Sequence, residues 1–359
     1  MKTPFKVSLV GLDSQIVPDS VISGFAERNI DFVVHECENR QDLAEWAGDA
    51  DVVWVFGSSR CLHGQMSPEE LSILPNCGAI IRTGSGTDNV PVKAATKLGI
   101  VVANTPDGLN DAVADHAIGL LFAVTRQIAL QDRNVRNRIW DRSRGFPNWH
   151  MTGQTLGFVG FGRIARTVVE KLAGFKMTNL AYDPFVLPRV FAQHSVQSVS
   201  LDELFQRSDF VSIHCPLTSQ TRHLIGKAQF EKMKPEAILI NTSRGPVVDE
   251  SALIAALASK QICGAGLDVL EKEPPDWDNP LFQFDNVVIT PHLAGYSDQY
   301  LPNSWRLSME TAIDLSQGKW PRSCVNPEVQ ARWKLTREMG PSSKPLRTNE
   351  PILGSHKEP

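Results

Sequence analysis

The sequence contains no apolar run of the roughly 18 residues that a membrane-spanning helix needs. It also has no excess of basic residues, because 36 Lys and Arg against 40 Asp and Glu leave a formal net charge of −4. A near-neutral chain lacks the dense positive surface of a non-specific nucleic-acid binder. We therefore expect neither a membrane nor a nucleic acid as a partner.

The six cysteines form no Cys-x-x-Cys pair and do not cluster with histidines at the spacing of metal ligands. This pattern predicts free thiols in a reducing cytoplasm and no metal site. The N-terminal apolar run stops at Asp13 without a small-residue cleavage pattern, which favours a first β-strand over a signal peptide.

Strand-like and helix-like segments alternate in two separate series, one over the first hundred residues and one from residue 155. The length of 359 residues also suits two domains. Almost continuously apolar strands such as residues 51–56 are typical of parallel sheets buried on both faces. The pattern predicts an α/β fold with two doubly wound parallel sheets. The expected strands are 6–10, 31–34, 51–56, 79–82, 101–103, 155–159, 179–182, 210–213, 237–241, 264–268 and 287–290.

Helical segments of unusual length separate and follow the two series. Residues 111–140 predict one long helix whose apolar first half is buried between domains or subunits. A polar connector over 141–152 follows it, and residues 297–317 predict a last long helix. From 328 to 359 the chain is polar and rich in Pro, Lys and Ser, which predicts a mobile tail.

The segment 160–165 reads Gly-Phe-Gly-Arg-Ile-Ala, directly after one expected strand and opening a helix. Gly160 permits the tight turn, Gly162 lets the backbone approach a pyrophosphate, and Ala165 lets the helix pack closely. Asp183 ends the next strand, where a carboxylate accepts hydrogen bonds from a ribose and repels a 2′-phosphate. These features favour NAD over NADP. Two alternatives stay open: Asp183 begins a turn before Pro184, and methyltransferases use a similar glycine-rich turn.

Three further polar residues follow expected strands. Arg244 offers a planar fork for a carboxylate, Glu273 precedes a Pro-Pro pair, and His292 precedes small residues. A histidine paired with a carboxylate is a suitable proton donor near neutral pH. Beside NAD, these groups fit a 2-oxo acid/2-hydroxy acid couple, whereas a methyltransferase gives them no role. Each taken alone is also consistent with a loop arginine, a solvated glutamate and a structural histidine.

Several well-separated segments share, in order, the motifs of one family. With them the sequence resembles the D-isomer-specific 2-hydroxyacid dehydrogenases, which include phosphoglycerate dehydrogenases and the C-terminal-binding-protein corepressors, over roughly 6–326. The segments are 82–90, 104–108, 160–165 with Asp183, 214–217, 241–245 with 248–250, 267–274 and 291–295.

The resemblance implies a catalytic set of Arg244, Glu273 and His292, with His292 the acid/base and Glu273 its partner. It implies that Ser85, Gly86, Arg244 and His292 bind the substrate. The expected NAD-binding residues are Ser85, Gly160, Gly162, Arg163, Ile164, Asp183, Cys215, Thr242, Ser243, Arg244, Asp268, His292 and Gly295.

The resemblance also implies a Rossmann NAD-binding domain, residues 106–297, inserted into a discontinuous flavodoxin-like substrate domain of residues 1–105 and 298–327. It implies a homodimer formed through residues 109–140. An NAD-sensing, corepressor-like interaction protein is the alternative function within the same family.

Some positions depart from the family pattern. Gly57 stands where phosphoglycerate dehydrogenases commonly carry a phosphate-binding arginine, and Arg60 is close but shifted. Leu109 and Asn110 replace the usual residues after Asn-Thr-Pro-Asp-Gly, and Asp115 replaces a glutamate. The sequence therefore does not identify the 2-hydroxy acid.

Overall fold

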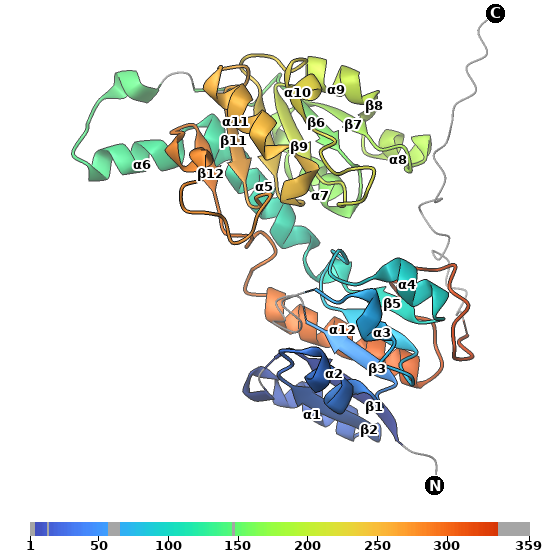
Figure 1. Cartoon of the computed structure of the whole chain (residues 1–359). Helices are drawn as coiled ribbons and strands as arrows, with labels where there is room; N and C mark the ends of the chain where they lie inside the picture. Colours follow the sequence, from blue (N-terminus) through green and yellow to red (C-terminus); the bar gives the residue numbers. More distant parts are fainter. Residues whose placement is uncertain (1–3, 13, 57–64, 146–147, 337–359) are drawn as a thin grey trace, which may run out of the picture. The chain divides into compact units, whose positions relative to one another are not determined.

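The computed structural model describes residues 4–12, 14–56, 65–145 and 148–336. These residues form two compact units, each built on its own parallel sheet with helices on its faces (Figure 1). The first unit comprises residues 4–109 and 297–336, and the second lies within 110–296. The predicted α/β class with two parallel sheets is confirmed.

The first unit has the strand order β2-β1-β3-β4-β5, which is the flavodoxin-like order. Helix α12, from the far end of the chain, packs on this sheet through Trp305, whose ring lies 5.5 Å from that of Trp54. The elements are β1 (Phe5–Val10), α1 (Asp19–Ala26), β2 (Ile30–His35), α2 (Arg40–Ala47), β3 (Val52–Val55), α3 (Pro68–Leu71), β4 (Ala79–Arg82), α4 (Val92–Lys97), β5 (Val101–Asn104) and α12 (Tyr300–Ser316).

The second unit has the order β12-β11-β10-β9-β6-β7-β8, in which β6 to β8 lie on one side and β9 to β12 on the other. This is the Rossmann order with one added strand, and its switch point lies between β6 and β9. The elements are α5 (Asn110–Thr125), α6 (Ile128–Arg136), β6 (Thr155–Val159), α7 (Arg163–Lys171), β7 (Thr178–Tyr182), α8 (Pro188–Gln193), β8 (Gln197–Ser198), α9 (Leu201–Arg207), β9 (Phe210–Ile213), α10 (Lys227–Phe230), β10 (Ile238–Asn241), α11 (Glu250–Ala258), β11 (Gly264–Leu267) and β12 (Val287–Ile289).

Two apolar cores cover the two faces of the second sheet. Helices α5 and α7 contribute residues such as Leu120 and Val168 to one core, and α9 to α11 contribute Phe205 and Leu253 to the other. The inner strands are therefore buried on both sides, which explains their continuous apolar runs.

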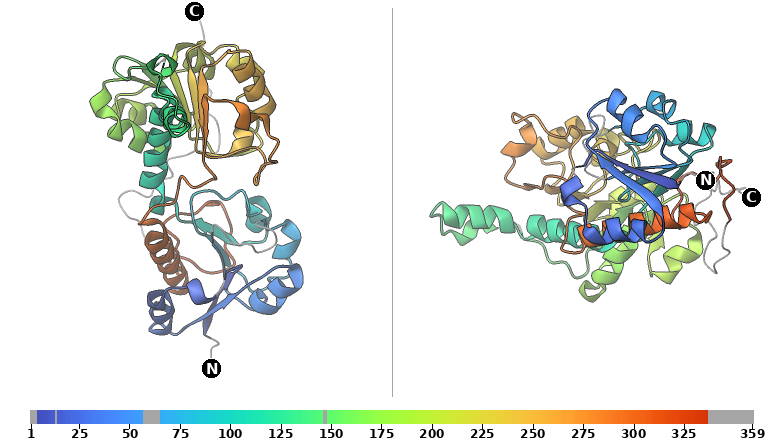
Figure 2. Two further views of the ribbon diagram at one scale, coloured as in Figure 1. Left: turned by 90° about the vertical axis from the view of Figure 1, so that its left-hand side faces the viewer. Right: turned by 90° about the horizontal axis from the view of Figure 1, so that it is seen from below.

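The prediction of one helix over residues 111–140 is wrong. The chain forms α5 and α6, which meet at a 60° bend, because Gln127 has a left-handed backbone with φ of 51°. Helix α6 projects from the rest of its unit (Figure 2). Within the described ranges no single helix is long and apolar enough to span a membrane, although α5 and α6 together pass that test of length and composition.

The prediction of a tail from residue 328 is wrong for residues 328–336, which pack on the first unit. The Trp333 ring lies 5.5 Å from the Phe5 ring, and the Arg332 guanidinium donates to the carbonyls of Leu98, Pro75 and Cys77. Val329, Ala331 and Leu335 also pack on the core of this unit, so the segment is held by apolar side chains as well as by Arg332. Residues 337–359 lie outside the described part of the chain.

Candidate active site

The glycine-rich turn lies at the switch point of the second sheet. Gly160 has a φ of 90°, and its N–H donates to the Tyr182 carbonyl at 2.8 Å. A Cβ at Gly160 would lie 2.7 Å from the backbone nitrogen of Cys215. Only glycine fits this conformation and this close approach of the loops after β6 and β9. The structure thus brings two predicted cofactor residues, Gly160 and Cys215, into contact.

The Asp183 carboxylate lies beside this turn. Its Oδ2 accepts the Phe161 N–H at 2.9 Å and its Oδ1 accepts the Phe185 N–H at 3.0 Å. Asp183 therefore both begins a turn and braces the glycine-rich loop. A carboxylate oxygen has lone pairs beyond these bonds, so the position still suits a ribose hydroxyl.

The residues around the turn fit a bound dinucleotide. Helix α7 begins with Arg163 and Ile164 after Gly162, which has no side chain to cap it, so its first-turn amides are available to an anion. The hydroxyl of Thr242, after β10, is buried and has no hydrogen-bond partner among the described residues. Buried hydroxyl groups are usually hydrogen-bonded, so this one is available to a polar group of a bound ligand.

The loop after β10 carries Arg244. The Asn241 side chain accepts the Ser243 N–H at 3.0 Å and donates to the Arg244 carbonyl at 3.1 Å, and the Ser243 hydroxyl donates to the Cys215 carbonyl. These bonds fix the backbone from which the guanidinium extends. A Cβ on the next residue, Gly245, would lie 1.8 Å from the Leu270 carbonyl oxygen. The Arg244 loop therefore packs directly on the loop that leads to Glu273.

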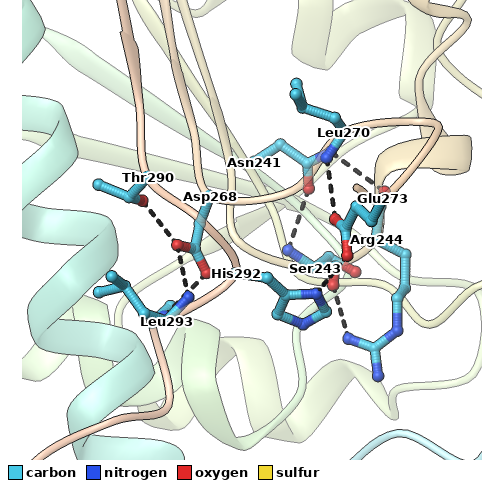
Figure 3. A network of polar contacts seen from close by, with 10 residues as sticks. Asn241, Ser243, Arg244, Asp268, Leu270, Glu273, Thr290, His292 and Leu293 are labelled. Atoms are coloured by element: carbon cyan, nitrogen blue, oxygen red, sulfur yellow. Dashed lines mark hydrogen bonds and ion pairs between the residues drawn. The ribbon is translucent and has the colours of Figure 1, made fainter. Parts of the chain in front are cut away.

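Glu273 and His292 form the central pair of the site. Glu273 Oε2 lies 2.6 Å from His292 Nδ1, and its Oε1 accepts the Leu270 N–H at 3.0 Å. Figure 3 shows Arg244 beside this pair, with all three side chains gathered at one end of the sheet. The structure thus brings the three predicted catalytic groups together.

The environment of Glu273 sets its charge. Burial would raise the pKa of its carboxyl, but the hydrogen bond and charge of His292, the Leu270 N–H and the Arg244 guanidinium together lower it below the usual value. The carboxylate is therefore ionised at neutral pH and acts only as an acceptor. His292 Nδ1 must then carry a hydrogen, which leaves Nε2 for other chemistry.

The remaining expected residues occupy several environments. Asp268 directly follows β11 and is 1% exposed, and Gly295 follows the His292 turn. Ser85 and Gly86 lie in the first unit after β4, where the Ser85 carbonyl accepts from the Asn104 side chain and its buried hydroxyl has no partner among the described residues. Their role in substrate binding stays a prediction.

The structure shows contacts for two of the positions that depart from the family pattern, Asp115 and Leu109. Asp115 pairs with the Lys171 ammonium at 2.6 Å and so joins α5 to α7. Leu109 packs in the core of the first unit. Gly57 and Arg60 lie outside the described residues. No group of three or more potential metal ligands occurs in the described part of the chain.

The sequence analysis did not place two side chains of this region, His116 on α5 and Thr290 after β12, in the site. His116 Nε2 lies 2.8 Å from Thr290 Oγ1, and Thr290 donates to Asp268 at 2.6 Å. A polar histidine inside the apolar stretch 112–124 is the signal that could have identified this contact.

Comparisons with known proteins agree on one family. Residues 118–294 match the model of the D-isomer specific 2-hydroxyacid dehydrogenase, NAD binding domain. The chain is 40% identical to a D-3-phosphoglycerate dehydrogenase of Archaeoglobus fulgidus over 320 residues, which are 89% of the chain and 60% of that relative. It is 36% identical to a glyoxylate reductase of Thermofilum pendens over 88% of the chain and 94% of that relative.

Solved structures share the fold across most of the chain. A glyoxylate reductase from Paecilomyes thermophila aligns with a TM-score of 0.83 at 27% identity and covers 90% of this chain and 99% of its own. The holo form of Rhodotorula graminis D-mandelate dehydrogenase also gives 0.83 at 27% identity, over 91% and 99%.

Proposed function

The chain belongs to the D-isomer-specific 2-hydroxyacid dehydrogenase family, and from that premise we propose that it transfers hydride between NAD(H) and a small 2-oxo acid or D-2-hydroxy acid. The observation that carries the proposal is the 2.6 Å pair between Glu273 and His292 Nδ1, with Arg244 in the adjoining loop. An acid/base, its orienting carboxylate and a carboxylate-binding cation are the groups that this reaction requires.

His292 acts as the general acid in reduction and as the general base in oxidation. Glu273 holds Nδ1, so Nε2 gives a proton to the substrate carbonyl oxygen in reduction and takes it back in oxidation. Arg244 binds the substrate carboxylate with its planar fork and polarises the carbonyl. The nicotinamide cofactor, when bound, supplies or accepts the hydride.

The cofactor is held by the glycine-rich turn and its neighbours. The first-turn amides of α7 would bind the pyrophosphate, the Asp183 carboxylate would accept from the ribose, and the Thr242 hydroxyl would gain a partner. Asp183 repels a 2′-phosphate, so we propose NAD over NADP as the preferred cofactor.

A substrate screen tests this function. NADH oxidation by the purified protein is followed with glyoxylate, hydroxypyruvate, pyruvate, phenylpyruvate, 2-ketogluconate and 3-phosphohydroxypyruvate. We expect a clear preference for one of them, and a loss of about 10²-fold or more in kcat for His292→Ala. A wild type that binds NADH but reduces none of the six would contradict the proposal and support an interaction protein.

The relatives do not identify the substrate. They include proteins named for phosphoglycerate and for glyoxylate, and the chain spans only 60% of the length of the phosphoglycerate dehydrogenase from Archaeoglobus fulgidus. The screen therefore includes a phosphorylated and several unphosphorylated oxo acids.

We also infer a homodimer formed through residues 109–140. The projecting α6 and the segment after it expose Ile128, Val135 and Trp140, with Trp140 82% exposed. Apolar side chains gathered on a projecting arm are typical of an interaction surface. Sedimentation analysis should give a dimer for the wild type and a weaker dimer for Trp140→Asp combined with Val135→Asp. A wild type that sediments as a monomer would contradict this assembly.

A further inference from the structure

The Asp268 carboxylate receives hydrogen bonds from the backbone that follows His292. Its Oδ1 accepts the Leu293 N–H at 2.9 Å, and its Oδ2 accepts the Ala294 N–H at 2.8 Å. Its own carbonyl accepts the His292 N–H at 2.8 Å. Three successive amides, from His292 to Ala294, therefore depend on one buried residue at the end of β11.

The turn at His292 needs this support. His292 has a φ of 51°, a left-handed conformation that non-glycine residues adopt at an energetic cost. Its ring is 46% exposed, so side-chain packing does little to hold it. The hydrogen bonds to Asp268 fix the backbone from which the imidazole reaches Glu273, as Figure 3 shows.

A chain of donors fixes the Asp268 carboxylate in turn. The Thr290 hydroxyl has one hydrogen and donates it to Asp268 Oδ1 at 2.6 Å. At 2.8 Å from His116 Nε2, the Thr290 oxygen must then accept, so Nε2 carries a hydrogen. Nε2 also lies 3.5 Å from Asp268 Oδ1. The direction of donation therefore runs from His116 through Thr290 to Asp268.

We propose that His116 and Thr290 are positioning residues that hold the acid/base turn at His292 through the Asp268 carboxylate. The proposal rests on the proposed function for its effect on turnover, but the contacts that carry it do not depend on a substrate. His116 lies on α5, which packs against β11 and β12 from outside the catalytic loops. The helix thereby contributes to the reaction without touching a reacting atom.

Matched variants separate this role from simple packing. Thr290→Val keeps the shape but removes the donor and acceptor, whereas Thr290→Ser keeps both. His116→Leu removes the donor to Thr290, whereas His116→Gln retains an N–H at the place of Nε2.

Amide hydrogen exchange of Leu293 and Ala294 is the first measurement, made on the protein without substrate. We expect Thr290→Val and His116→Leu to speed this exchange about tenfold, the scale of one hydrogen bond to a charged group. Thr290→Ser and His116→Gln should stay within about threefold of the wild type. The melting temperature of each variant is the check that it is folded.

Turnover is the second measurement. In Thr290→Val and His116→Leu, kcat should fall about tenfold while the KM for the oxo acid stays within about threefold, because Arg244 is untouched. The conservative variants should recover most of kcat.

Equal exchange at Leu293 and Ala294 in Thr290→Val and Thr290→Ser would overturn the proposal. If Thr290→Val does not fold, the two His116 variants decide the question by the same comparison. A wild type that reduces no oxo acid would refute the proposed function alone, because the exchange experiment would still test the network.

Discussion

The two ring nitrogens of His292 have different surroundings, because only Nδ1 contacts the Glu273 carboxylate. Nδ1 lies 2.6 Å from the Glu273 carboxylate, and in the proposed reaction Nε2 would exchange the proton with the substrate. The proximity of Glu273 and His292 could be predicted from the sequence, because both follow strands that end at the same edge of the sheet. The left-handed backbone of His292 could not, since it depends on Asp268 and residues far along the chain.

The lowered pKa of Glu273 predicts a pH-dependent contribution to stability. A carboxyl whose pKa is lowered by folding stabilises the protein above its unfolded pKa of about 4.3, and this contribution is lost as pH falls through the folded value. We therefore expect Glu273→Gln to have a lower melting temperature than the wild type at pH 6–7. The difference should shrink below about pH 4.3. Thermal unfolding of both proteins from pH 3 to 7 measures it, and a difference that grows toward acid would contradict the assignment.

Asp183 predicts a change in cofactor preference. Asp183→Ala removes both the negative charge and the bond to the Phe161 N–H, whereas Asp183→Asn removes mainly the charge. Both variants should lower the ratio of kcat/KM with NADH to that with NADPH, by about tenfold or more for the loss of a charge opposed to a phosphate. Steady-state kinetics with the two cofactors measure the ratio. A wild type that already prefers NADPH would refute the role of Asp183.

Two loops, after β10 and after β11, carry Arg244 and Glu273. The two loops contact each other at Gly245, because a residue without a side chain lets their backbones approach closely. The positions of most strands along the chain and the glycine-rich turn were predictable, since apolar runs and short turn motifs are local in sequence. The contact between α5 and Thr290 was not, because no local pattern states which helix faces which strand end. The bend at Gln127 was missed for a similar reason, since glutamine rarely marks a left-handed position.

Gly245→Ala should separate these loops. Its Cβ would meet the Leu270 carbonyl at 1.8 Å, which forces the backbone to shift at a cost of about 1–3 kcal/mol in stability. The shift should also lower kcat. Gly174→Ala, at an exposed position with nothing within 4 Å of the added Cβ, is the control and should change stability by no more than about 0.5 kcal/mol. Denaturant unfolding and turnover of both variants test this, and an unaffected Gly245→Ala would show that the loops do not depend on that contact.

At the scale of the whole molecule, each unit has its own sheet and its own apolar core. The first is completed by segments distant in sequence, α12 and residues 328–336. The Trp333 ring lies so close to Gly78 that a Cβ there would be 2.0 Å from it. The polar composition of residues 328–359 as a whole predicted a tail. Within it, Val329, Ala331, Trp333 and Leu335 alternate with polar residues and pack on the core of the first unit.

Trp333→Ala should destabilise the first unit. The ring is partly buried, so we expect about 1–3 kcal/mol, less than for a fully buried tryptophan. Trp277→Ala is the matched control, because Trp277 is 88% exposed and its loss should change stability by no more than about 0.5 kcal/mol. Calorimetric unfolding of the two variants measures the difference, and equal melting temperatures would place Trp333 outside the folded unit.

In the proposed reaction the protein reduces a 2-oxo acid to the D-hydroxy acid, with His292 as the proton donor. Its most direct test is the product formed from the preferred oxo acid and NADH that carries deuterium at the transferable position. We predict the D-2-hydroxy acid with deuterium on the carbinol carbon from the wild type, and almost none from His292→Ala. An L-configured product, a product without deuterium, or undiminished formation by the variant would contradict the account.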